Sequence, residues 1–169
     1  MTQKQLLALV RKLISDEQAT GFTEGGNLEE PEGTQELLNY LDRAVDEYSK
    51  RQALLKDLRL VKRMSAVNGV KVPEDFLSFA GAIPVSVDNG IMSFYGENNS
   101  LPVRYFARLP YVTSYSEDEE MPFEPDQRIT IAALAAIYAL NKHEFNVSQD
   151  LMLLGMGVTT NANEEQQTQ

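Results

Sequence analysis

The feature that most constrains the fold is a long amphipathic segment, residues 34–58, which neither Gly nor Pro interrupts. Its apolar side chains recur in alternating steps of four and three, with one break at Arg51, and so form one stripe along an α-helix. The stripe consists of Leu37, Leu41, Ala44, Tyr48, Leu55 and Leu58. Because such a helix is stable in water only when its stripe is buried, we expect it to pack on the rest of the chain and on copies of it.

Composition excludes several kinds of site. The chain has 169 residues, 43% of them apolar, which is enough to bury a core. It has no Cys, one His and a formal charge of −10, which exclude thiolate sites and argue against a surface built to bind DNA phosphates. No phosphate-binding loop, hydrolase motif or metalloprotease motif is present. We therefore expect no enzymatic activity, no cofactor and no metal site.

Charge is unevenly distributed along the chain. Residues 33–64 hold seven basic and five acidic side chains, whereas residues 117–169 hold ten acidic and two basic ones. The densest basic cluster is Lys50, Arg51, Lys56, Arg59, Lys62 and Arg63. This cluster is interpreted as a solvated face, with a contact to an acidic neighbour or a nucleic-acid patch as alternatives; no interleaved aromatic residues support stacking on bases. Opposite charges of this kind allow the two ends to attract one another between subunits.

The N-terminal third predicts one short helix and one loop. Residues 3–14 have an amphipathic helical pattern, and residues 15–33 are rich in Gly and acid without any period. The first residues do not have the features of a secretory signal, and no segment reaches the roughly 18 apolar residues that span a bilayer. We expect a soluble protein that is made in a cytoplasm and does not enter the membrane.

The middle of the chain predicts short antiparallel strands. Residues 60–67 and 70–72 flank Asn68 and Gly69, a strong hairpin signal, and residues 82–87 and 91–95 flank a second signal at Asn89 and Gly90. Residues 102–109 predict a further strand. Residues 73–77 predict a turn that brings Phe76 into the core.

The last third predicts a buried helix and a polar tail. Residues 129–140 are apolar on nearly all sides, after an N-cap at Asp126 and an acidic loop at 113–125. His143 is explained by a favourable contact with the end of this helix. Residues 149–156 predict a last short helix, and residues 159–169 are too polar to fold without a partner.

Together these patterns predict an α+β fold, a helical bundle with one long central helix plus a small antiparallel β region. We expect an N-terminal helix and flexible acidic loop at 1–33, a central domain at 34–157 and a polar C-terminal tail at 158–169.

The order of these parts resembles the head–tail adaptor (connector or head-completion) proteins of tailed bacteriophages, especially short-tailed ones. The resemblance is carried by VPEDFL at 72–77, by VRYFARLP at 103–110, and by a helix that opens with Asp126 and continues through Ile129 to Leu140. It covers roughly residues 34–155. The chain lacks the tryptophans that such proteins often contain.

The resemblance implies a structural protein of the virion, located at the head–tail junction and synthesised in the host cytoplasm. Such proteins form a ring, typically of twelve copies, under the portal protein. The ring extends the DNA channel, through which DNA passes without specific binding, and docks a tail or nozzle protein. An extended terminal segment commonly contacts the portal. The central domain at 34–157 would then be the adaptor domain.

Two sets of contact residues follow from this interpretation. The expected subunit interface is Leu37, Leu41, Tyr48, Arg51, Leu55, Arg59 and Ile137. The expected portal or tail contacts are Thr159, Thr160, Asn161, Asn163, Tyr111 and Tyr115. The alternatives are a tail-completion ring protein and, from a different class, an acidic cytoplasmic adaptor or regulatory oligomer. An enzyme is the third alternative.

Overall fold

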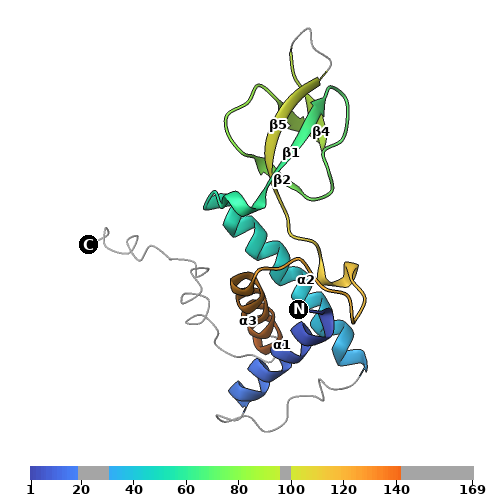
Figure 1. Cartoon of the computed structure of the whole chain (residues 1–169), viewed down its shortest axis with the longest axis vertical. Helices are drawn as coiled ribbons and strands as arrows, with labels where there is room; N and C mark the ends of the chain where they lie inside the picture. Colours follow the sequence, from blue (N-terminus) through green and yellow to red (C-terminus); the bar gives the residue numbers. More distant parts are fainter. Residues whose placement is uncertain (19–30, 96–99, 142–169) are drawn as a thin grey trace, which may run out of the picture.

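The computed structural model of the chain describes residues 1–18, 31–95 and 100–141. Within these ranges, the helices lie at one end of an elongated body and the strands at the other (Figure 1). The helices are α1 (Gln3–Gln18), α2 (Pro31–Leu54) and α3 (Pro125–Asn141), with short 3-10 helices η1 (Leu58–Leu60) and η2 (Val112–Ser114). The strands are β1 (Val61–Val67), β2 (Phe76–Phe79), β3 (Ser86–Asp88), β4 (Ile91–Ser93) and β5 (Ser100–Ala107).

The helical core is built on the apolar stripe of α2. Leu37, Leu41 and Ala44 are fully buried, and Tyr48 is 3% exposed. These side chains pack with buried residues of α1 and of α3, among them Leu6, Val10, Ile131 and Leu134. The amphipathic helix expected at residues 3–14 is therefore confirmed, although α1 continues to Gln18.

The central helix ends four residues before the expected position, and a backbone motif explains why. Lys56 has a φ of 60°, its N–H donates to the carbonyl of Ala53 at 3.1 Å, and the N–H of Asp57 donates to that of Gln52 at 2.9 Å. These are the two hydrogen bonds of a Schellman motif, in which the left-handed residue is normally Gly. Leu55 and Leu58, which the periodic pattern placed on the buried stripe, are 62% and 76% exposed as a result.

The strands form two antiparallel sheets. The larger sheet has the order β1-β5-β2, and the smaller one pairs β3 with β4. The turn between β3 and β4 has positive φ at both Asn89 and Gly90, 49° and 76°, as a type I′ hairpin requires. The hairpin expected at Asn89 and Gly90 is therefore confirmed. The sheets enclose a small core of their own, which contains Ala66, Val85, Met92 and Val103.

The hairpin expected between residues 60–67 and 70–72 is wrong. A turn does form, since the N–H of Val70 donates to the carbonyl of Val67 at 3.2 Å. However, β1 pairs along its whole length with β5, from Val61 opposite Phe106 to Val67 opposite Ser100. Residues 70–72 are cut short by Pro73 and cannot offer a ladder of that length. They pair instead beside β4, where the N–H of Met92 donates to the carbonyl of Val70 at 2.9 Å.

The expected fold class, a helical bundle with one long central helix plus a small antiparallel β region, is also wrong. The described residues form an α+β fold of three helices and five strands in two antiparallel sheets. The β part was underestimated because β2 resembled a turn. Phe76, expected in that turn, begins a strand that pairs with β5.

The helix α3 follows the sequence pattern with two differences. It begins at Pro125, so Asp126 lies in its first turn rather than at the N-cap, and Ile129 is 64% exposed. His143, the helix expected at 149–156 and the tail at 159–169 lie outside the described residues. Among the helices that are described, none combines the length and apolarity needed to cross a membrane.

The Schellman motif gives a matched pair of substitutions at one position. Lys56→Gly removes the cost of a left-handed residue with a Cβ, about 1 kcal/mol, and should leave the free energy of unfolding unchanged or raise it. Lys56→Val should lower it by about 1–2 kcal/mol, because a β-branched residue tolerates positive φ worst. Urea denaturation measures both. Equal stability of the two variants would contradict the left-handed conformation.

Candidate functional site

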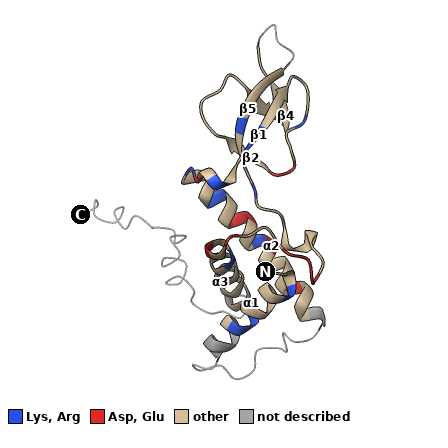
Figure 2. Cartoon of the chain, viewed as in Figure 1, with Lys and Arg blue, Asp and Glu red and all other residues tan. Residues whose placement is uncertain are grey.

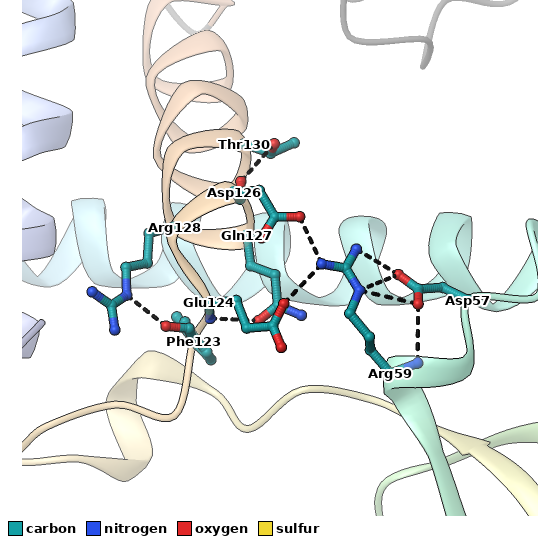
Figure 3. A network of polar contacts seen from close by, with 8 residues as sticks. All are labelled: Asp57, Arg59, Phe123, Glu124, Asp126, Gln127, Arg128 and Thr130. Carbon is teal, nitrogen blue, oxygen red and sulfur yellow. Dashed lines mark hydrogen bonds and ion pairs between the residues drawn. The ribbon is translucent and has the colours of Figure 1, made fainter.

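The helical and β parts meet at a joint that is held by one arginine. Arg59 lies in η1, just before β1, and its Nη1 atom is 2.8 Å from both Glu124 Oε2 and Asp126 Oδ2 (Figure 3). Its Nη2 atom is 2.7 Å from Asp57 Oδ2. One guanidinium, with its fork of donors, thus connects the end of α2 with the start of α3. We call Asp57, Arg59, Glu124 and Asp126 the Arg59 cluster.

Local capping places each member of this cluster. Asp57 caps η1, since its carboxylate accepts from the N–H of Arg59 at 3.0 Å. At the start of α3, the side-chain oxygen of Gln127 accepts from the N–H of Glu124 at 2.9 Å. This is half of a capping box, with Pro125 at the first helical position. The two carboxylates Glu124 and Asp126 are therefore fixed in front of Arg59.

The electrostatics of the Arg59 cluster favour ionised side chains. Hydrogen bonds from Arg59 hold the pKa of Asp57 and of Asp126 below their usual value of 3.8. Hydrogen bonds to the three carboxylates, with Asp57 first, raise the pKa of Arg59. One positive charge faces three negative ones, so the cluster has no spare positive charge for an anion. Arg59, Glu124 and Asp126 are exposed and Asp57 is half-buried, so each ion pair alone is worth little.

Asp75 makes the second set of contacts at the joint. It lies just before β2, and its carboxylate accepts from Lys62 at 2.6 Å and from the hydroxyl of Tyr105 at 3.1 Å. Its backbone carbonyl accepts from the N–H of Arg108 at 2.7 Å. Burial, together with the hydrogen bond to Asp75, raises the pKa of Tyr105 to about 12. Asp75 therefore connects β1, β5 and the start of β2.

The segment after β5 is joined to α2 by two polar side chains of the helix. Ser49, which is fully buried, accepts from the N–H of Leu109 at 3.1 Å and donates to the carbonyl of Val45 at 2.7 Å. Asp42 accepts from the N–H of Val112 at 2.6 Å and from the hydroxyl of Thr113. These contacts fix where the chain leaves the sheet and crosses the helical part.

A cavity of about 410 Å³ opens at this joint. Its walls come from Arg59, Leu60 and Lys62, from Asp75, from residues 107–110 at the end of β5 and after it, and from Tyr115 and Pro122. Arg108 lies with its guanidinium carbon 3.6 Å from the ring centre of Tyr111, and its buried Nε atom has no acceptor within the described part of the chain. In the same ranges, no group of three or more metal-ligating side chains comes together.

The residues expected at a subunit interface divide into two groups. Leu37, Leu41, Tyr48 and Ile137 are buried in the core of the single chain, with at most 7% of their surface exposed. Their apolar surface is already used within the chain. Arg51 and Leu55 are exposed, and Arg59 belongs to the Arg59 cluster.

The residues expected at a portal or tail contact are only partly described. Tyr111 and Tyr115 are half-buried and pack against the helical core. The backbone carbonyl of Tyr115 accepts from the side chain of Gln3 at 3.0 Å, which ties α1 to this segment. Thr159, Thr160, Asn161 and Asn163 lie outside the described residues.

Exposed charges of opposite sign occupy two separate regions. The end of α2 next to the sheets carries exposed basic residues, whereas the loop before α3 carries exposed acidic ones at 117–120 (Figure 2). The sequence predicted this separation of charge. It did not predict the roles of Asp42, Ser49, Asp75 and Gln127, because polar residues that cap or cross-link give no periodic signal.

Comparison with known proteins does not identify a family for this chain. The chain matches no protein-family model, and no curated protein sequence matches it. The function must therefore be argued from the residues and their geometry.

The Arg59 cluster predicts a pH-dependent effect of Arg59→Gln. Because the pKa of Asp57 and of Asp126 is lowered in the folded state, their contribution to stability is present above the unfolded value of 3.8 and is lost as pH falls through the folded value. Thermal denaturation should show a melting temperature that is lower than that of the unsubstituted chain by a few degrees at pH 7, and the difference should be smaller at pH 3.

Arg63→Gln is the matched control, because Arg63 is an exposed arginine on β1 without an ion pair among the described residues. It should leave the melting temperature nearly unchanged at both pH values. A difference for Arg59→Gln that stays constant down to pH 3 would contradict the assigned role of the two aspartates.

Proposed function

We propose that this chain is a structural protein of the virion, a head–tail adaptor that forms a ring under the portal of a tailed bacteriophage. In this role it extends the DNA channel and provides a docking surface for the tail. It acts by assembly and binds no cofactor. The polar tail at 159–169 is the segment assigned to the portal.

The observation that carries this proposal is the convergence of three sequence motifs at the joint. Asp75 belongs to VPEDFL, Tyr105 and Arg108 belong to VRYFARLP, and Asp126 lies in the first turn of α3. In the structure Asp75 bonds to both Tyr105 and Arg108. Asp126 bonds to Arg59, which lies in η1 two residues before β1. Motifs that are up to some fifty residues apart thus all contribute contacts to the joint between the helical and β parts. This is expected if the three motifs are characteristic of one fold.

Charge supports a ring that is closed by contacts between unlike surfaces. A ring of identical copies requires two different, complementary patches on each chain. One patch is the exposed basic end of α2 with Lys50, Arg51 and Lys56, and the other is the acidic loop at 117–120. The net charge of −10 suits a channel in which DNA must slide, because a basic lining would bind the phosphates.

Native mass spectrometry of the purified chain, alone and mixed with the portal protein of the same virus, tests the proposal. Ring-sized species that form only with the portal are expected. Lys50→Glu combined with Arg51→Glu should reduce their abundance, whereas Lys71→Glu, at an exposed position on the β part, should not. A chain that lacks residues 159–169 should keep its melting temperature and bind the portal more weakly.

One outcome would overturn the proposal, and another would exclude the charged contact that it invokes. A stable dimer whose abundance does not depend on the portal would favour a regulatory oligomer instead. Rings that form equally well with and without the two reversed charges would exclude the charged contact between copies, while leaving the fold described above intact.

A further inference from the structure

A group of exposed leucines lies at and just after the end of α2. Leu54, Leu55 and Leu58 are 77%, 62% and 76% exposed. They lie within five residues of one another, on either side of the Schellman motif. We call them the leucine surface. Apolar side chains that are exposed together are a feature of contact sites on soluble proteins.

Basic residues surround the leucine surface. Lys50, Arg51 and Lys56 are all exposed, and only Lys50 has an ion pair among the described residues, with Asp46 at 2.5 Å. A segment that covers this surface should therefore be apolar and carry negative charge nearby. A purely apolar segment would leave these positive charges without partners and would therefore be less complementary to this surface.

One segment of the chain itself has this composition. Residues 150–156, DLMLLGM, contain five large apolar side chains and open with Asp150. Glu144 lies six residues further upstream. We propose that residues 150–156 bind the leucine surface of the same chain, with Asp150 toward its basic border.

The length of the intervening chain allows this contact. Arg43 of α2 lies over the ring of Tyr138 of α3, with 4.2 Å from the guanidinium carbon to the ring centre. Leu54 is eleven residues further along α2, about 16 Å at the helical rise. α3 continues to Asn141, and the ten residues from there to Leu151 reach up to about 33 Å as extended chain. The segment can therefore return to the leucine surface without strain, and its attachment gives it a high effective concentration there.

The contact also has a structural consequence for the end of the chain. Docking of residues 150–156 would place the start of the polar tail beside the joint between the helical and β parts. The contact lies within one chain and does not depend on the adaptor role, so its failure and that of the proposed function are separable.

Disulfide trapping tests the contact cleanly, because the chain has no native Cys. The full chain carrying Leu54→Cys and Leu153→Cys is oxidised mildly, and products are separated without reductant. Lys71→Cys with Leu153→Cys is the matched control, since Lys71 is exposed on the β part. We expect an intramolecular disulfide that forms roughly tenfold faster than in the control, because docking raises the local thiol concentration.

A second pair, Leu58→Cys with Leu151→Cys, is included because the two thiols of the first pair could be badly oriented for a disulfide. Circular dichroism shows whether each variant is folded. Equal rates for both test pairs and the control would overturn the contact. Disulfides that join two chains instead of closing within one would also overturn it, because they would show that the segment covers a neighbouring copy.

Discussion

The structure depends on the burial of one side of α2. Leu37, Leu41, Ala44 and Tyr48 enter a core to which α1 and α3 contribute, and none is more than 3% exposed. The same helix leaves this core at its end, where the Schellman motif at Lys56 turns the chain and leaves Leu54, Leu55 and Leu58 outside. One helix thus contributes to the interior of the chain and leads into a group of exposed leucines.

The joint beyond that helix contains several polar contacts. The Arg59 cluster connects α2 with α3, and Asp75 connects the strands that follow. Most of these side chains are exposed or half-buried, so they add little stability individually and instead fix orientation. For a protein proposed to work by assembly, orientation is what matters, because ring closure requires every copy to present its two patches at the same angle.

Much of this arrangement could be predicted from the periodicity of the sequence. Each feature that was predicted wrongly has a physical explanation. The stripe of α2, the helix at residues 3–14 and the turn at Asn89 and Gly90 each have a strong local signal and were predicted. The end of α2 was misplaced because Lys56 takes a conformation that sequence assigns to Gly. The partner of β1 was wrong because pairing with β5 joins residues about forty apart, which no local pattern encodes. At the joint, Arg59 was predicted as an intermolecular contact, yet its carboxylates come from its own chain.

The most direct test of the account is the stability of Leu41→Ala, measured by urea denaturation over a range of protein concentrations. Since Leu41 is fully buried within the single chain, the free energy of unfolding should fall by about 2–5 kcal/mol, whatever the concentration. A loss below about 1 kcal/mol, or one that appears only at concentrations where copies associate, would contradict it. Such a result would mean that the stripe of α2 faces a neighbouring copy and not the core of its own chain.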